Sequence, residues 1–266
     1  MTSYSQTGKI LSKEEERLQN ITEGKEKSQE VELVFRETEE ELFQACYDPK
    51  EKRSFFAIYN RETGEVSYDD LRVEGLRDEK PRLLKPIFND LVEKKAVLLP
   101  TKAEDYGSEA ELVQEIQDFI HKYLDVEPFW ENLGAQYVLL SHTYDGLTIV
   151  PYIRALGDWG TAKTRLILTI GMCCYMPMKG SGATTSAAVK RMIEKHKGTL
   201  IIDEGDFKDS GEAADIIKIF NTGFENESPV ISCEPEGRGE YEPKAYRTFC
   251  PKLISSRKRW KDKALE

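Results

Sequence analysis

The sequence has 266 residues, of which 32% are charged and 39% hydrophobic, and its formal net charge is −10. This length suits one large domain or one core with a smaller module, and the composition is ordinary for a globular chain. The negative charge argues against a generally basic nucleic-acid coat, although it permits a local basic surface.

Targeting signals and metal motifs are missing from the sequence. No apolar run approaches the roughly 20 residues that cross a bilayer, and the first residues do not resemble a secretory signal. The five cysteines include the adjacent Cys173 and Cys174, and no Cys or His spacing typical of a zinc site occurs. We therefore expect a cytoplasmic protein with reduced cysteines and without a membrane partner.

The N-terminal part divides into a tail and a small module. Residues 1–29 are rich in Glu, Lys, Ser, Gln and Thr, which predicts a disordered tail or a frayed helix. Residues 30–105 predict a small α+β module. Its expected elements are a strand at 30–35, a short helix at 37–47, two strands joined at a turn of Glu62, Thr63 and Gly64, and a helix running into a strand over 82–100.

Residues 106–266 have a different pattern of predicted helices and strands. Ser108 and Glu111 have capping-box spacing before an amphipathic helix, and a second helix ends by Gly146. From residue 151 strands and helices alternate, which predicts an α/β fold with a parallel sheet flanked by helices. The expected elements are strands at 152–157, 198–206, 229–233, 245–249 and 252–256, and helices at 164–175, from Thr185 or Ser186 to 196, and at 209–223 with a cap near Asp209 or Ser210.

The stretch "GDWGTAKT" has the parts of a phosphate-binding loop. It follows the apolar strand "YIRAL", Gly157 and Gly160 permit a tight turn, and a helix follows whose N-terminus attracts anions. Lys163 is placed for the β- and γ-phosphates and Thr164 for Mg²⁺. Ala162 is tolerable there if its backbone is helix-like with negative φ. The nucleotide contacts are expected from Gly157, Asp158, Trp159, Gly160, Thr161, Ala162, Lys163, Thr164 and Arg165.

Two acids further along the chain favour this interpretation. The loop alone equally suits a loop-to-helix junction with a solvated lysine. "TLIIDE", however, ends an apolar strand with Asp203 and Glu204, and desolvated carboxylates are costly unless paired or metal-bound. We expect Asp203 and Thr164 to hold Mg²⁺ and Glu204 to act as general base. The alternative is a strand end that reaches solvent with both acids hydrated.

A third polar position is expected on the strand "KLISS". In a nucleotide-hydrolysing sheet, a polar side chain on the strand between those of the two motifs can orient water near the γ-phosphate. Ser256 is the first candidate, with Ser255 and Arg257 as alternates. The alternative is a strand that runs into a basic loop, which would have the same sequence.

These motifs together resemble a known family. "GDWGTAKT" is similar to the "GDPGTAKS" Walker A loop of minichromosome-maintenance helicases, in which alanine also replaces the last glycine. The later motifs then follow the order of an AAA+ P-loop core, as "GATTSAAV", "LIIDEGDF" and "KLISSRKRWKDKALE". The resemblance is closest to helicase-like ATPases of prophages and mobile elements, and it covers the chain from the helices before the loop onward.

The resemblance implies an ATP- and Mg²⁺-dependent DNA-replication motor. Such motors form a ring, usually a hexamer, with DNA, here expected to be single-stranded, in the channel. A hairpin before "KLISS" would touch DNA through Arg238, Lys244 and Arg247. An ordinary solvated hairpin is the alternative, because Glu234, Glu236, Glu240 and Glu242 surround its tip. The stronger basic cluster, which could instead serve a subunit interface, is Arg257, Lys258, Arg259, Lys261 and Lys263.

The sequence departs from the family pattern in two places. Trp159 stands where proline is usual, and it could stack on a base or pack against the preceding helices. In the family, the helical lid and the arginine finger would follow Glu266, so we expect nucleotide binding to exceed turnover. An ATP-dependent assembly switch is therefore the alternative function, whereas an unused loop is disfavoured by the retained acids.

Overall fold

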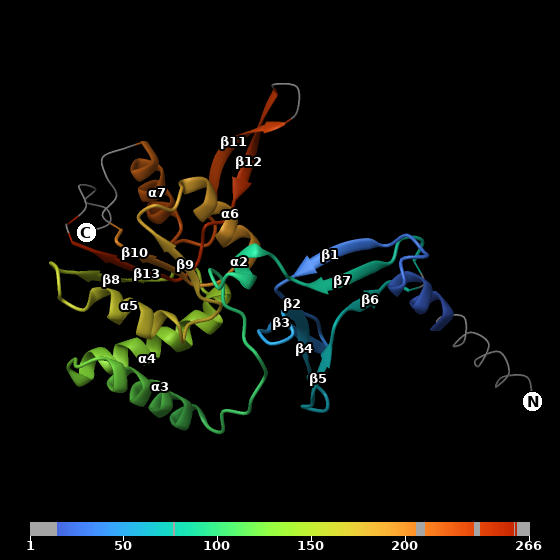
Figure 1. Cartoon of the computed structure of the whole chain (residues 1–266), viewed down its shortest axis with the longest axis horizontal. Helices are drawn as coiled ribbons and strands as arrows, with labels where there is room; N and C mark the ends of the chain where they lie inside the picture. Colours follow the sequence, from blue (N-terminus) through green and yellow to red (C-terminus); the bar gives the residue numbers. More distant parts are fainter. Residues whose placement is uncertain (1–14, 77, 206–210, 237–239, 258, 260–266) are drawn as a thin grey trace, which may run out of the picture. The chain divides into compact units, whose positions relative to one another are not determined.

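The computed structural model describes residues 15–76, 78–205, 211–236, 240–257 and 259. The chain forms two compact units (Figure 1). The N-terminal unit comprises Met1–Lys94 and Leu99–Glu104, and the C-terminal unit comprises Lys95–Leu98 and Asp105–Glu266. The boundary predicted at residues 105 and 106 lies next to this division.

The N-terminal unit contains two small sheets. One has the order β1-β7-β6, and the other is the antiparallel meander β2-β3-β4-β5. Phe43 and Phe56 meet edge to face at 6.0 Å in its core. The elements are β1 (Gln29–Leu33), β2 (Phe35–Glu37), β3 (Glu41–Asp48), β4 (Arg53–Asn60), β5 (Val66–Asp69), β6 (Arg72–Glu74), β7 (Arg82–Pro86) and the short helix α2 (Asp90–Glu93).

Two predictions for this unit are wrong. The expected helix at 37–47 is the strand β3, which pairs with β2 and β4 and buries Phe43, Ala45 and Cys46. Tertiary pairing therefore overrides the helix propensity of the glutamates in the segment 37–47. The segment 82–100 begins with a strand and continues into a short helix, the reverse of the expected order.

Part of the predicted tail is ordered. Residues 15–22 are helical and Ile21 is buried, so the expectation of disorder is wrong for them and the helical alternative holds. Residues 1–14 lie outside the described residues. The two strands predicted around the turn at Gly64 are confirmed as β4 and β5.

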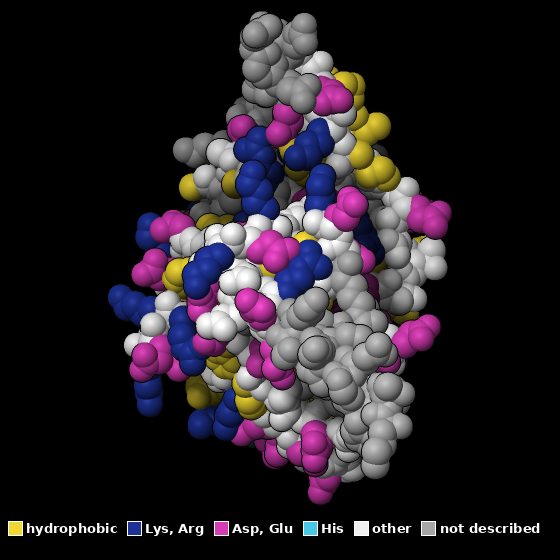
Figure 2. All heavy atoms as spheres, turned by 90° about the vertical axis from the view of Figure 1, so that its right-hand side faces the viewer, with side chains coloured by type: hydrophobic (Ala, Val, Ile, Leu, Met, Phe, Trp, Pro, Cys, Tyr) yellow, Lys and Arg dark blue, Asp and Glu magenta, His cyan; other side chains and the backbone are white. Residues whose placement is uncertain are grey.

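Ion pairs join the strands of the N-terminal unit. Glu74 pairs with Arg36 at 2.7 Å and with Arg82 at 3.2 Å, and Lys85 pairs with Glu30. Figure 2 shows Lys and Arg side chains interspersed with Asp and Glu on the face of the molecule that it presents. This face therefore presents mixed charge. The exposed Lys85–Glu30 pair contributes little to stability, whereas Glu74 and Arg36 are partly buried.

The C-terminal unit contains the predicted parallel sheet. Its strand order is β8-β13-β10-β9, and every pairing in it is parallel. The strand β9 was not predicted, whereas the placement of the "KLISS" strand between the other two motif strands is confirmed. The strands are β8 (Tyr152–Leu156), β9 (Met178–Ser181), β10 (Leu200–Asp203) and β13 (Lys252–Ser256).

Helices flank both faces of this sheet (Figure 1). The capping box of Ser108 and Glu111 is confirmed, and the helix expected to open at Thr185 or Ser186 begins at Ser186, with Thr185 as its N-cap. The predicted cap at Asp209 or Ser210 lies outside the described residues. One face carries α3 (Glu109–Tyr123), α4 (Pro128–Thr143) and α5 (Lys163–Gly171), and the other carries α6 (Ser186–His196) and α7 (Gly211–Thr222), with a 3-10 turn at Tyr144–Gly146 after α4.

A hairpin precedes the strand β13. It consists of β11 (Val230–Glu236) and β12 (Glu240–Tyr246), which pair antiparallel and extend away from the sheet in Figure 1. In the described part of the chain, no helix is long and apolar enough to cross a membrane.

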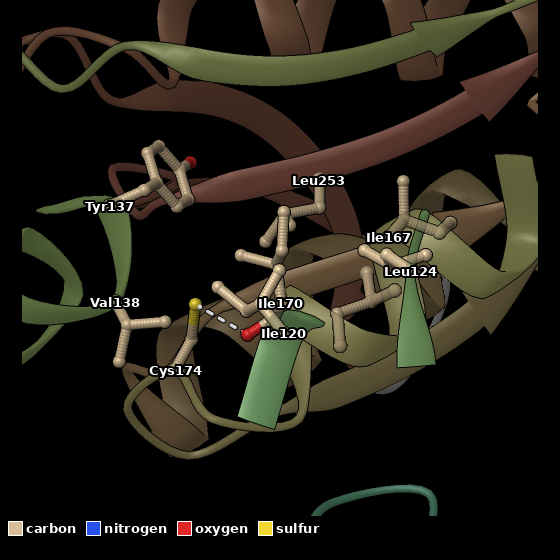
Figure 3. Packing of buried hydrophobic residues seen from close by; sticks show 9 residues of the cluster. Ile120, Leu124, Tyr137, Val138, Ile167, Ile170, Cys174 and Leu253 are labelled. Atoms are coloured by element: carbon tan, nitrogen blue, oxygen red, sulfur yellow. Dashed lines mark hydrogen bonds between the residues drawn. The ribbon is translucent and has the colours of Figure 1, made fainter. Parts of the chain in front are cut away.

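The apolar core of the C-terminal unit fixes α5 against the sheet. Gly171 allows this close approach, because a Cβ there would lie 2.6 Å from Ile201 Cδ1. Figure 3 shows the packing of the buried cluster, which is formed by Ile120, Leu124, Tyr137, Val138, Ile167, Ile170, Cys174, Ile201 and Leu253.

Tyr137 ties helix α4 to the start of β13. Its hydroxyl lies 3.0 Å from the carbonyl oxygens of Pro151 and Lys252 and accepts a hydrogen bond from the Lys252 N–H at 2.9 Å.

We expect Tyr137→Phe to lower the free energy of unfolding by about 1–3 kcal/mol, because buried backbone groups lose their partner. Urea unfolding measures this, with the exposed Tyr123→Phe as control; equal stability of the two variants would contradict it.

Candidate functional site

A cavity lies where three parallel strands end. In the register of the sheet, Ser256 lies opposite Leu156 and Ile254 opposite Ile202, so the carboxyl ends of β8, β13 and β10 meet at one edge. This edge is where open α/β sheets bind ligands. The cavity has a volume of about 230 Å³ and is lined by Trp159, Gly160, Thr161, Ala162, Lys163, Thr164, Asp203, Glu204, Ser255, Ser256 and Arg257.

The cavity brings together most of the predicted nucleotide-contacting residues. Six consecutive residues of the loop line it, together with both predicted acids. Gly157, Asp158 and Arg165 are not among its lining residues. The "GDWGTAKT" stretch and the "IIDE" stretch, far apart in the sequence, therefore line one cavity.

Glycines shape the turn that precedes helix α5. The Gly157 N–H donates to the Ser256 carbonyl at 3.2 Å, and a Cβ at Gly157 would lie 2.7 Å from Thr161 Oγ1. Gly160 has a φ of +75°, which side chains with a Cβ rarely adopt. The loop thus needs glycine at both positions, for different reasons.

The expectation for Ala162 is wrong. Its backbone is left-handed, with φ 56° and ψ 18°, and not helix-like. This conformation costs an L-residue about 1–2 kcal/mol, which explains why glycine is usual there. An alanine side chain also cannot cap the helix, so the first N–H groups of α5 lack a side-chain acceptor from this position and suit an anion.

Paired substitutions test this loop strain. We expect Ala162→Gly to raise the free energy of unfolding by about 0.5–1 kcal/mol, because relief of strain exceeds the added entropy of the unfolded chain. Gly160→Ala should lower it by about 1 kcal/mol, since a Cβ there meets no atom within 4 Å and only the backbone conformation opposes it. Urea unfolding measures both free energies. If the two substitutions changed the free energy of unfolding in the same direction, the left-handed backbone assigned to Ala162 and Gly160 would be contradicted.

Helix α5 presents its first two side chains to the cavity. The half-buried Lys163 donates through Nζ to the Asp158 carbonyl at 2.6 Å and to Thr161 Oγ1 at 3.2 Å. Thr164 Oγ1 lies 2.9 and 3.0 Å from the two carboxylate oxygens of Asp203. The helix N-terminus and the end of β10 are therefore joined directly.

Ser255 organises the two acids. Its hydroxyl donates to Asp203 Oδ1 at 2.5 Å and accepts the Glu204 N–H at 3.0 Å. Ser256 instead accepts from Arg154 Nε at 3.1 Å, although it also lines the cavity. Of the two serines, the alternate Ser255 therefore contacts the acids and the first candidate Ser256 does not.

Glu204 follows β10 in an unusual backbone conformation. Its φ is +54°, and a Cβ on Gly182 would lie 2.5 Å from the Glu204 carbonyl oxygen. The close approach of Gly182 and the hydrogen bond that the Glu204 N–H donates to Ser255 hold this strained turn. The exposed side chain of Glu204 thereby lines the cavity next to Asp203.

Thr164 and Asp203 suit a magnesium ion. Mg²⁺ prefers oxygen ligands and is usually held by one or two carboxylates together with substrate phosphates. Among the described residues, no group of three or more His, Cys, Asp or Glu side chains could hold a metal. A hydroxyl and a carboxylate this close fit an ion that also takes phosphate oxygens as ligands.

Trp159 lies at the cavity and does not pack into the preceding helices. Its side chain is 73% exposed, and the guanidinium carbon of Arg257 lies 4.4 Å from its ring centroid. The expected packing against those helices is therefore not observed. Stacking between the Trp159 ring and the Arg257 cation was not predicted.

The predicted DNA contacts of the hairpin differ in their surroundings. Lys244 is exposed on β12, with its Nζ 5.3 Å from the Tyr246 ring. Arg247 is held within the unit, since its guanidinium donates to Asn226 at 2.8 Å and its N–H to Glu194. Arg238, Lys258, Lys261 and Lys263 lie outside the described residues.

No known family model and no curated protein matches this chain.

Proposed function

We propose that this cavity binds ATP with Mg²⁺ and hydrolyses the terminal phosphate. The observation that carries the proposal is the hydrogen bond between Thr164 and Asp203. It joins the helix after a glycine-containing turn to the acid at the end of the buried strand β10, which β13 separates from β8. That combination is what a phosphate loop and a metal-binding acid require.

Each side chain has a role in this proposal. The loop N–H groups and Lys163 would bind the phosphates. Thr164 and Asp203 would hold Mg²⁺, which would supply positive charge against the phosphate oxygens. Glu204 takes a proton from the attacking water, whose oxygen bonds to the γ-phosphorus as the bond to ADP breaks. Ser255 positions both acids through its hydrogen bonds.

We further propose an AAA+ motor of the DNA-helicase type, working as a homo-oligomeric ring. The sequence resemblance supports this, as does the strand order in which β13 lies between β8 and β10. The hairpin β11–β12 directly precedes β13, and the exposed Lys244 on it is suited to phosphate contact. An ATP-dependent assembly switch is the second candidate, favoured if ATP binds without turnover.

Steady-state ATP hydrolysis with and without single-stranded DNA tests these alternatives. We expect turnover that Lys163→Ala removes and that DNA stimulates. Turnover indifferent to DNA would favour another AAA+ role, and binding without turnover would favour the switch. Hydrolysis equal in the unaltered chain and in Lys163→Ala would contradict the assigned site.

The metal role of Asp203 has its own test. We expect Asp203→Asn to weaken ATP binding about tenfold or more with Mg²⁺ present and to change it little with EDTA, because an amide oxygen is a poorer ligand for a hard cation. Equilibrium binding of a fluorescent ATP analogue measures both conditions, with Asp145→Asn as a charge-matched control. Equal weakening of ATP binding with Mg²⁺ and with EDTA would contradict the role of Asp203 as a metal ligand.

A further inference from the structure

The N-terminal unit has an open groove beside β5, the last strand of its meander (Figure 1). The groove has a volume of about 620 Å³, and residues of β4 and β5 line it together with Thr101 and Lys102. Phe55 and Tyr68 lie edge to face in its lining, with ring centroids 5.7 Å apart. Tyr68 is 49% exposed, so the groove presents an aromatic ring to a ligand.

The backbone of β5 has one side without a strand partner. Among the described strands, β5 pairs with β4 alone. The Asn60 N–H of β4 donates to the Glu65 carbonyl at 2.9 Å. Hydrogen-bonded pairs alternate along an antiparallel ladder, so Ser67 is the next bonded position of β5. Val66 and Tyr68 therefore direct their N–H and C=O groups to the side without a strand.

Negative charge exceeds positive charge in the groove. Three aspartates and two cations line it. Arg53 pairs with Asp70. Lys102 pairs with Glu104, so both cations are already matched by a carboxylate. The phosphates of a nucleic acid would be repelled by this excess of carboxylates, whereas a cationic partner would be attracted. The lining therefore favours a basic ligand.

The groove already holds one guanidinium group between a ring and a carboxylate. The guanidinium carbon of Arg53 lies 6.0 Å from the Phe55 ring centroid, and the same group pairs with Asp70. The Asp70 side chain is still 69% exposed, and Tyr68 lies two residues before it. A second guanidinium would therefore find an exposed ring and an accessible carboxylate at this edge.

We infer that β5 binds an extended basic peptide segment of a partner protein, which adds to the meander as a further strand. The peptide backbone pairs with Val66 and Tyr68, and a peptide arginine stacks on the Tyr68 ring and donates to Asp70. In this mode of recognition the backbone bonds provide affinity and the side-chain contacts provide sequence preference. Binding at this edge needs none of the residues that line the proposed ATP cavity.

Fluorescence anisotropy of a labelled heptapeptide of alternating threonine and arginine measures binding to the full chain. We expect saturable binding that Val66→Pro weakens about fivefold, because proline lacks the N–H that faces the added strand. Val66→Thr keeps that N–H and should bind as the unaltered chain does. Tyr68→Leu should weaken binding about threefold and Asp70→Asn about tenfold, through loss of the ring and of the charge.

Controls separate strand addition from other modes of binding. The exposed Asp90→Asn is charge-matched and should leave the affinity unchanged. An N-methylated peptide lacks backbone donors and should bind at least about tenfold more weakly, which tests the mode without altering the protein. Equal binding of the N-methylated peptide, or of a peptide with glutamate in place of arginine, would overturn the inference. So would a lack of saturable peptide binding, or oligothymidylate binding that Tyr68→Leu abolishes, which would assign this edge to nucleic acid.

Discussion

Glu204→Gln should keep ATP affinity within about twofold and lower the hydrolysis rate about 10²–10⁴-fold, the usual contribution of a general base. Glutamine preserves the size of the side chain and removes the basic oxygen. The backbone contacts that hold Glu204, from its N–H to Ser255 and Asp203, do not involve the substituted group. Single-turnover hydrolysis and equilibrium ATP binding, measured on the same sample, separate the two effects.

The exposed Glu227→Gln is the matched control for this substitution and should leave both quantities unchanged. Equal loss of binding and hydrolysis in Glu204→Gln would mean that Glu204 binds nucleotide or metal and is not the base. Unchanged hydrolysis would remove Glu204 from the reaction altogether.

Lys163→Ala should weaken ATP binding by at least about 100-fold, because two charge-assisted hydrogen bonds to phosphates, each about 1.5–3 kcal/mol, are lost. Lys163 now donates to Asp158 and Thr161 within its own loop, and we expect those bonds to be exchanged for phosphate oxygens. Equilibrium titration with a fluorescent ATP analogue measures the affinity.

Loss of those internal bonds could also loosen the loop. Thermal unfolding of Lys163→Ala without nucleotide therefore accompanies the titration, and Lys102→Ala in the N-terminal unit serves as the charge-matched control. A folded Lys163→Ala variant that binds ATP as tightly as the control would exclude Lys163 as a phosphate ligand.

The elements around the site were predictable because their signals are local. The capping box at Ser108 and the cap at Thr185 place two helix starts, since a side chain and the N–H groups it binds lie within one turn. The apolar strands that end in the loop, in Asp203 and in Ser256 predict a parallel sheet. The place of "KLISS" between the other two strands was expected from the pattern of nucleotide-hydrolysing sheets and not from a local signal.

Features that depend on distant contacts were not predictable. The segment 37–47 contains helix-favouring glutamates, and only the pairing of β3, which covers its second half, with β2 and β4 makes that part a strand. The choice between Ser255 and Ser256 depends on which side chain of a strand faces Asp203, and adjacent residues point to opposite faces. The left-handed backbone of Ala162 and the stack of Arg257 on Trp159 likewise arise only in the assembled loop.

Calorimetric titration of the unaltered chain with ATP tests the central claim most directly. The account predicts saturable binding of one ATP per chain, tighter with Mg²⁺ than with EDTA, and competition by ADP for the same site. No saturable binding with Mg²⁺ present, or binding of equal strength with and without the metal, would contradict a phosphate loop joined to a metal-binding Asp203.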